Sequence, residues 1–321
     1  MRQRNNVISL LRAVSMCSII LCHILQFYGN ELAFWFNVAV QIFLILSGYL
    51  YACREPSAVE GGGVFLFYKK NFYKILSRYY IYMIFIIPIY IIYAPQYLSV
   101  KNLIKHMFGF AGIQGLNHLW FISIILICYM ITPLLIVLQN SKNYIIVFIC
   151  TVIICEILFL KVAFINGAWV NCYVIGFLIG AIVKEKGMRI MGNMKLFLFV
   201  FILFAATNVY RIVISYKMNV FSSVSQEIIY YAHVFLALFI VLITFRLGNW
   251  GIEERIPIKM LFFTDKYSYC IYLTHHVFII GPFSVLLAFD KVIGVPLAIL
   301  LAFVTGVLLE KIGQKVDKAL F

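Results

Sequence analysis

The chain is dominated by long apolar runs, and these runs restrict what it can fold into more than any other feature. Ten stretches of about 20 residues carry few charges and are bounded by charged or turn-forming residues. A helix of this length crosses the hydrocarbon core of a bilayer. The predicted spans are residues 7–28, 33–51, 79–95, 119–138, 143–160, 168–184, 195–214, 228–246, 268–289 and 292–312.

Composition excludes the other classes of protein. Of the 321 residues, 64% are hydrophobic and only 12% are charged, whereas a soluble chain has about 25% charged residues. So few charges cannot cover the surface of a water-soluble globule, and so apolar a chain is not disordered. The unbroken runs also differ from the alternating strands of a membrane β-barrel. We therefore predict an all-α, multi-pass membrane protein with about ten spans in one bundle.

The distribution of Lys and Arg predicts the orientation of the spans, because cytoplasmic loops are enriched in these residues. With both termini in the cytoplasm, 19 of the 26 Lys and Arg residues fall inside, six fall outside, and Arg12 lies within the first span. This bias explains the net charge of +14 without a nucleic-acid partner. The start of the chain resembles a signal peptide, but no small-residue cleavage site follows, so we expect a retained first span.

Two connections are longer than a turn. Residues 52–78 mix aromatic and basic side chains and predict an interfacial segment on the inner leaflet. Residues 96–118 include a Gly-rich stretch and predict an outer loop or a re-entrant segment. Neither is long enough for a soluble domain, so we expect residues 1–321 to form a single transmembrane domain.

The first span holds two polar residues that the bilayer disfavours, Arg12 and His23. An Arg inside a span costs about 2.5–3.5 kcal/mol on insertion scales and needs a partner, a hydrated cavity or a route to the headgroups. The two positions differ by eleven in residue number, which places them on one helix face about 16 Å apart. We interpret them as lining one hydrated tunnel. The alternative is an Arg that reaches the inner headgroups and an interfacial His.

Further polar residues are predicted at both ends of the spans. His118, Glu156, Asn171, Asn208, Arg211 and His233 fall in the outer halves of the fourth to eighth spans. Each fits a helix–helix hydrogen bond as well as a functional role, and Glu156 is expected to need a cationic neighbour such as Arg211 or a His. On the inner side, Lys70, Lys74 and Arg78 recur every four residues. Such a cationic row fits either anionic lipid headgroups or a phosphate-rich small molecule.

Several other chemistries lack the residues that they need. His275 and His276 are adjacent, so on a helix they point about 100° apart and make a poor pair of metal ligands. No other spacing predicts a metal site, and there is no nucleophile elbow, phosphate-binding loop or dinucleotide fingerprint. We expect no metal cofactor.

Four motifs occur in order along the spans. Arg12 and His23 are separated by ten residues in the first span. Residues 43–49 read Phe-Leu-Ile-Leu-Ser-Gly-Tyr, residues 117–121 read Asn-His-Leu-Trp-Phe, and residues 268–275 read Ser-Tyr-Cys-Ile-Tyr-Leu-Thr-His. Together they resemble the signatures of acyltransferase family 3, the bacterial ten-span membrane O-acyltransferases of cell-surface glycans. The resemblance covers most of the chain.

The resemblance implies a donor on one side of the membrane and an acceptor on the other. Acyl-CoA, with acetyl-CoA as the expected donor, would place its phosphates on Lys70, Lys74 and Arg78, while a hydroxyl of a glycan or lipid-linked sugar would approach His23 from outside. His23 would act as general base and Arg12 would hold the donor or stabilise the thioester oxygen. The resemblance extends to supporting or substrate-binding residues, which are Ser47, His118, Trp120, Tyr272 and His275, to which we add Glu156.

One departure from the family pattern concerns the cytoplasmic loop. Where the family has an Arg-x-x-Arg pair and then a Pro, this chain has Asn71, Lys74 and Ser77. Lys binds phosphate as a point charge and lacks the planar fork of Arg, so donor recognition is expected to be looser or differently arranged.

The expected function is therefore acyl transfer in the bacterial cytoplasmic membrane, with the bilayer, acyl-CoA and a glycan as partners. Whether the thioester reaches His23 directly or the acyl group is relayed stays open. A proton-coupled transporter or flippase is the alternative, because it too would carry intramembrane Arg, Glu and His. Against a transporter, no matching pair of interrupted spans indicates inverted repeats. A third interpretation is the membrane module of a larger fusion protein.

Overall fold

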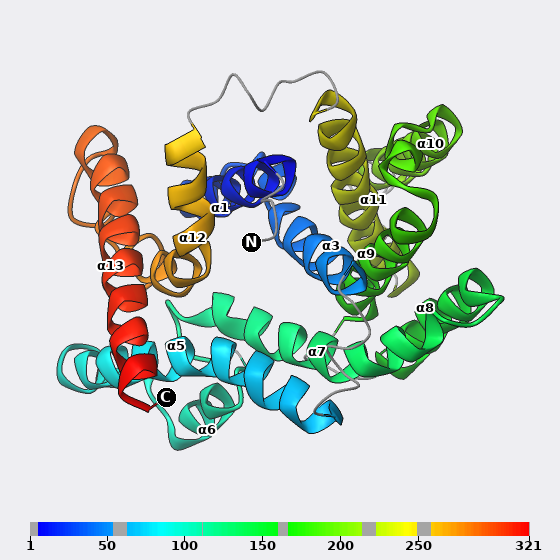
Figure 1. The fold of residues 1–321 in the computed structure, drawn as a ribbon. Helices are drawn as coiled ribbons and strands as arrows, with labels where there is room; N and C mark the ends of the chain where they lie inside the picture. Colours follow the sequence, from blue (N-terminus) through cyan, green and yellow to red (C-terminus); the bar gives the residue numbers. More distant parts are fainter. Residues whose placement is uncertain are drawn as a thin grey trace. The chain divides into compact units, whose positions relative to one another are not determined.

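The computed structural model describes residues 6–53, 63–110, 112–159, 166–213, 223–248 and 258–320. These residues form helices and turns, and no β-strand occurs among them (Figure 1). The helices are α1 Asn6–Phe27, α2 Ala33–Phe36, α3 Ala39–Ala52, α5 Gly63–Tyr93, α6 Val100–Met107, α7 Phe121–Leu138, α8 Tyr144–Phe159, α9 Gly167–Lys186, α10 Met194–Tyr210, α11 Ser223–Gly248, α12 Ile258–Thr274 and α13 Lys291–Leu320. Short 3₁₀ turns are η1 Pro95–Tyr97, η2 Asn117–Trp120, η3 Met188–Gly192 and η6 His276–Phe278.

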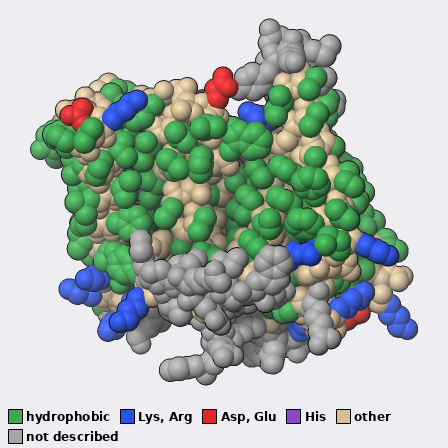
Figure 2. Space-filling model, turned by 90° about the horizontal axis from the view of Figure 1, so that it is seen from above, with side chains coloured by type: hydrophobic (Ala, Val, Ile, Leu, Met, Phe, Trp, Pro, Cys, Tyr) green, Lys and Arg blue, Asp and Glu red, His purple; other side chains and the backbone are tan. Residues whose placement is uncertain are grey.

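The prediction of an all-α, multi-pass membrane protein is confirmed. Eight helical segments of the described chain are long and apolar enough to cross a bilayer, and α8 is a shorter apolar helix. Figure 2 shows hydrophobic side chains over most of the face in view. Ile84 and Val292, for example, keep 69% and 82% of their surface exposed, which is favourable in lipid but not in water. The count of ten crossings and the cytoplasmic termini stay predictions.

Two spans differ most from their predicted bounds. The third was predicted as residues 79–95, after a separate interfacial segment, but residues 63–78 continue into it as the single helix α5. The described sequence has no helix breaker there before Pro88, so the helix runs for 31 residues. The ninth was predicted as residues 268–289, but α12 ends at Thr274 and residues 279–290 form turns. Gly281, with φ +117°, and Pro282 explain why the helix does not continue.

The chain divides into two compact units that interleave along the sequence. The first unit comprises residues 1–15, 37–61 and 130–261, and the second unit comprises residues 16–36, 62–129 and 262–321. Helix α1 begins in the first unit and ends in the second.

The first unit is organised around a close contact between α3 and α9. A Cβ atom on Gly176 would lie 2.1 Å from the carbonyl oxygen of Ile45, and one on Gly48 would lie 2.1 Å from that of Tyr173. Gly176 and Gly180 are four residues apart, a small-residue spacing that lets helix backbones approach closely within a membrane. Helix α9 also packs on α8, and α10 packs on α11.

The second unit joins α5 to α12 and α13. The Tyr269 hydroxyl of α12 donates a 2.8 Å hydrogen bond to the carbonyl oxygen of Ile75 in α5. A Cβ on Gly306 of α13 would lie 2.6 Å from the Ile271 side chain, so glycine permits the contact with α12. These contacts place the C-terminal end of α12 within the second unit, where the candidate site is found.

Candidate functional site

Four histidines meet in the second unit, from three separate parts of the sequence. His23 lies near the C-terminal end of α1, His118 lies in η2, and His275 and His276 follow α12. The ring centroid of His276 is 4.5 Å from that of His23 and 4.6 Å from that of His118, on which it stacks. The ring of His275 is 5.2 Å from His23 and 5.0 Å from His118. We call these residues the four-histidine cluster.

Hydrogen bonds fix which ring nitrogens carry protons in three of these histidines. His118 Nε2 lies 3.2 Å from the carbonyl oxygen of Leu273, His275 Nδ1 lies 2.7 Å from that of Tyr272, and His276 Nδ1 lies 2.8 Å from that of Gly115. A carbonyl oxygen only accepts, so each of these nitrogens must donate. In a neutral imidazole the other nitrogen then keeps its lone pair.

Two of these lone pairs are buried and unused. Within the described chain, His118 Nδ1 and His275 Nε2 have no hydrogen-bond partner. A buried polar atom without a partner costs about 1–3 kcal/mol, and such atoms are a recognised feature of sites that bind or react. The cluster therefore offers acceptor atoms to a ligand hydroxyl.

His23 differs from the others because a side chain directs its ring. His23 Nδ1 lies 2.6 Å from the Oε1 atom of Gln26, which is one helical turn further along α1. The amide oxygen accepts, so Nδ1 donates and Nε2 keeps a lone pair. His23 is half-buried and Gln26 is exposed. This geometry is the one that a general base requires, with one nitrogen anchored and the other available.

The backbone around the cluster is itself held in place. The Tyr90 hydroxyl donates a 2.7 Å hydrogen bond to the carbonyl oxygen of Gln114, and the Tyr272 hydroxyl donates to that of His118. Gly115 has φ +85°, and a Cβ there would lie 2.4 Å from the Tyr90 hydroxyl. Only glycine fits this position, which presents the Gly115 carbonyl to His276.

Several predicted site residues belong to the second unit, and others belong to the first unit. His23, His118, Tyr272 and His275 share the second unit, and the rings of His118 and Tyr272 are 5.4 Å apart. Trp120 belongs to the same short turn as His118 and is half-buried. Arg12 of α1 and Ser47 of α3 are half-buried residues of the first unit.

Sequence reasoning missed two members of the site. His276 was considered only as a metal ligand, although its ring contacts both His23 and His118. Gln26 was not considered, and its only signal in the sequence is its spacing of three residues from His23.

Among the residues that the structure describes, no group of three His, Cys, Asp or Glu side chains is arranged to hold a metal ion.

Glu156 lies in the first unit, in a polar group of its own. Its Oε2 atom accepts hydrogen bonds from Asn171 Nδ2 at 3.0 Å and from the Tyr231 hydroxyl at 2.8 Å. Both of these donors are neutral groups, and the side chain of Glu227 also hydrogen-bonds to Glu156. The expected cationic neighbour of Glu156 stays a prediction. A Cβ on Gly167 would lie 2.5 Å from Oε2, so the start of α9 packs directly on the carboxylate.

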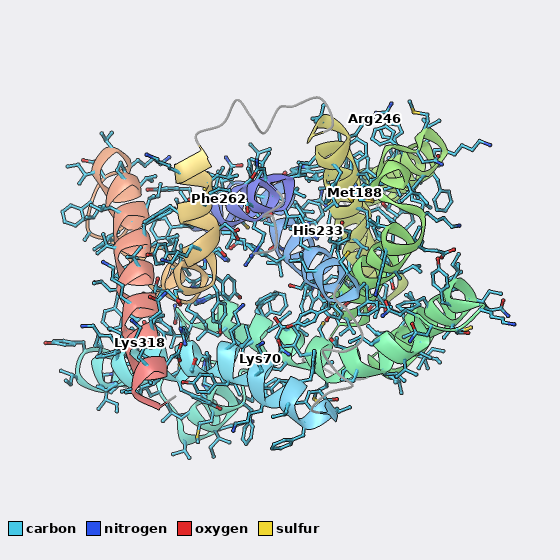
Figure 3. The ribbon with its side chains drawn as sticks, viewed as in Figure 1. Lys70, Met188, His233, Arg246, Phe262 and Lys318 are labelled. Atoms are coloured by element: carbon cyan, nitrogen blue, oxygen red, sulfur yellow. The ribbon has the colours of Figure 1, made fainter. Side chains whose placement is uncertain are left out.

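The three cations of α5 differ in their burial and in their partners. Arg78 is buried and pairs with two carboxylates of α13, at 3.2 Å from Glu310 and 2.6 Å from Asp317. The Tyr73 hydroxyl also donates to Asp317, at 2.8 Å. Lys70, on the N-terminal half of α5 (Figure 3), and Lys74 are exposed.

The expectation that Arg78 binds the donor phosphates stays a prediction, and its two ion pairs would compete with such binding. Its guanidinium is already matched by Glu310 and Asp317, which lie 232 and 239 residues away in the sequence. Its neighbour Gly313 leaves room for this pairing, since a Cβ there would lie 2.5 Å from Arg78 Nε. Lys70 and Lys74 are the exposed members of the row.

A family model described as an acyltransferase domain matches residues 5–310. The match includes the four-histidine cluster, Arg12 and both units of the chain. Comparison with curated proteins and with solved structures gave no match.

Proposed function

Because this chain belongs to acyltransferase family 3 and is a membrane acyltransferase, we propose that it moves an acyl group, with acetyl as the expected group, from cytoplasmic acyl-CoA to a sugar hydroxyl. The acceptor is a glycan or lipid-linked sugar outside the cytoplasm, and the membrane is the bacterial cytoplasmic membrane. The observation that carries this proposal is the anchored ring of His23, whose Nδ1 is bound to Gln26 and whose Nε2 keeps its lone pair.

The proposed reaction begins when His23 Nε2 takes the proton of the acceptor hydroxyl. The hydroxyl oxygen then attacks the thioester carbonyl and forms a C–O bond, with negative charge collecting on the carbonyl oxygen. The C–S bond breaks, and the CoA thiolate leaves with the proton from His23. The hydrogen bond from Nδ1 to Gln26 keeps the ring in place while the imidazolium forms.

Other residues are assigned supporting roles in this proposal. The buried lone pairs of His118 Nδ1 and His275 Nε2 would accept hydrogen bonds from the sugar hydroxyls. Arg12 would stabilise the thioester oxygen or hold the donor, as the resemblance implies. Lys70 and Lys74 would contact phosphate, either of the donor or of lipid.

The test uses purified protein, acetyl-CoA labelled in the acetyl group, and membranes that contain candidate acceptors. We expect transfer of label to a glycan, and we expect His23→Ala to lower the rate by at least about 100-fold, the lower end of the effect of a general base. Labelled protein that accumulates without an acceptor would identify a relay through His23. Transfer at the normal rate by the His23→Ala protein would refute the role of His23.

A proton-coupled transporter or flippase is the second candidate. The polar group around Glu156 favours it, because intramembrane carboxylates mark proton relays in pumps and transporters. In vesicles, a transporter would move a sugar across the membrane without acyl-CoA. Transport that needs no acyl donor would support this candidate against acyl transfer.

A further inference from the structure

A polar pocket of about 350 Å³ lies in the first unit, apart from the residues assigned above. It is formed by the connection from α7 to α8 and by the C-terminal turn of α9. Both segments are predicted on the cytoplasmic side, where an acyl-CoA donor would arrive. The side chains that carry the argument are Gln139, Asn140, Lys142, Lys184 and Glu185.

Gln139 has a buried amide that the described protein leaves unsatisfied. Both Nε2 and Oε1 are buried without a hydrogen-bond partner among the described residues. An amide has donors on nitrogen and an acceptor on oxygen, so a simple anion would satisfy only one side. A ligand that presents a donor beside an acceptor would satisfy both, and the edge of adenine has this pattern and pairs with Gln through two hydrogen bonds.

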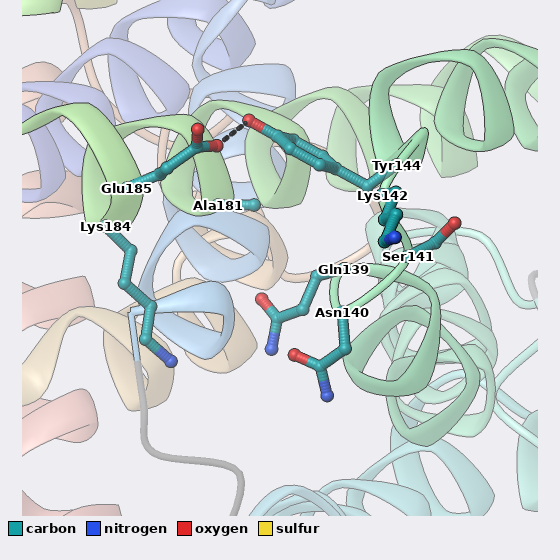
Figure 4. Close-up of a pocket in the computed structure, with 8 residues that line it drawn as sticks. All are labelled: Gln139, Asn140, Ser141, Lys142, Tyr144, Ala181, Lys184 and Glu185. Carbon is teal, nitrogen blue, oxygen red and sulfur yellow. Dashed lines mark hydrogen bonds between the residues drawn. The ribbon is translucent and has the colours of Figure 1, made fainter.

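The charges beside this amide favour phosphate. Lys142 and Lys184 line the same pocket. The one carboxylate, Glu185, accepts a 2.5 Å hydrogen bond from the Tyr144 hydroxyl. Figure 4 shows the ends of Gln139, Asn140 and Lys184 extending in one direction, away from the Tyr144–Glu185 bond. The Lys184 ammonium and the amides of Gln139 and Asn140 are therefore grouped on one side of the pocket, and Lys142 lines it beside Ser141.

We propose that this pocket binds an adenine nucleotide bearing phosphate, which is the head of the thioester donor. The identity of the ligand as the donor rests on the proposed function, but nucleotide binding can be measured without acyl transfer. Gln139 would pair with the base, and Lys142 and Lys184 would contact the phosphates of the nucleotide. Lys70 and Lys74 would then contact the phosphate of lipid.

The experiment measures binding of adenosine 3′,5′-bisphosphate to the purified full chain in detergent. Loss of a bidentate base contact should weaken binding by about tenfold or more, so we expect this result for Gln139→Met. Replacing an unsatisfied buried amide by an apolar side chain of similar size should leave the melting temperature unchanged or raised. Lys142→Gln with Lys184→Gln should weaken binding and reduce its salt dependence. The matched control is Lys186→Gln, on the same helix but outside the pocket lining, with less than a twofold change.

The choice between nucleotides tests the contact with the base separately from the contact with the phosphates. Wild-type protein should prefer the adenosine compound to its guanosine counterpart, and Gln139→Met should lose this preference. Equal binding of inorganic pyrophosphate would overturn the base contact, and displacement of the nucleotide by vesicles of anionic phospholipid would assign the pocket to lipid headgroups. Normal binding by Gln139→Met would refute the proposal while leaving acyl transfer intact. Pocket-dependent nucleotide binding without any acyl transfer would instead refute the proposed function alone.

Discussion

At the scale of single residues, the candidate site depends on oxygen atoms that decide the protonation of imidazole rings. Three carbonyl oxygens and one amide oxygen each accept from one ring nitrogen of the four-histidine cluster. The amide of Gln26 is the one exposed member of this set. An oxygen that anchors a histidine sets its tautomer as well as its orientation, so we expect Gln26 to act on the proposed reaction through His23.

Gln26 is expected to be a positioning residue. Gln26→Leu removes the acceptor for His23 Nδ1, so the ring can adopt the wrong tautomer, and kcat should fall by about 10- to 100-fold with little change in KM. Gln26→Glu keeps an acceptor oxygen at the same distance and should retain most of the activity. Because Gln26 is exposed, both variants should fold normally. Equal activity of the Gln26→Leu and Gln26→Glu variants would show that Gln26 does not position His23.

Titration of His106 is expected to make the free energy of unfolding depend on pH. It lies in α6, in the connection between spans, is buried, and accepts a 3.0 Å hydrogen bond from the Ile113 amide at Nε2. Burial lowers its pKa from the usual 6.5 to about 4. As pH falls, His106 of the unfolded chain therefore binds a proton at a higher pH than His106 of the folded protein, and this favours unfolding. The contribution of neutral, buried His106 to the free energy of unfolding is complete above pH 6.5 and is lost between about pH 6.5 and 4.

The difference of about 2.5 pKa units sets an upper limit of about 3 kcal/mol for this effect. Thermal unfolding in detergent across this pH range should show a falling melting temperature for the wild-type protein. His106→Gln, which does not titrate, should show a flatter profile. Parallel profiles for the two proteins would mean that His106 is not the group responsible.

At the scale of elements, ion pairs between Arg78 of α5 and two carboxylates of α13 connect these helices within an apolar protein. Removing one partner of a buried ion pair leaves an uncompensated charge, which costs about 3–5 kcal/mol. Arg78→Met leaves Glu310 and Asp317 facing each other, and Asp317 is one-third exposed, so we expect a loss of about 3 kcal/mol. Lys70→Met, on an exposed position of the same helix, is the control and should change stability by less than about 0.5 kcal/mol. Denaturant unfolding would compare the two, and equal effects would contradict a structural role for Arg78.

The helices also show which features local sequence could predict. The bounds of α1, α7 and α9 follow their apolar runs closely, because hydropathy over about 20 residues reports directly on burial in lipid. The ion pairs of Arg78 could not be predicted, because its partners Glu310 and Asp317 are more than 200 residues away. The motifs named His23, His118 and His275, but their convergence and the contribution of His276 depend on packing between distant helices.

At the scale of the whole molecule, the remaining prediction concerns the membrane. The prediction of ten spans with both termini in the cytoplasm can be tested at two positions between predicted spans. With both termini inside, Lys101 faces outward and Lys186 faces the cytoplasm, as the Lys and Arg bias of the loops requires. Both residues are exposed, so each can be replaced without disturbing packing.

Single cysteines at these two positions test the orientation. In intact cells, a membrane-impermeant maleimide should label Lys101→Cys, whereas Lys186→Cys should be labelled only after the membrane is permeabilised. The parent protein has eight cysteines, of which Cys17 and Cys150 are exposed on the protein surface, so its own labelling gives the background. Labelling of both positions from outside would contradict the predicted ten-span topology. It would also move the polar pocket near Lys184 to the side that the proposed acyl-CoA donor does not reach, because Lys186 lies on the same helical turn.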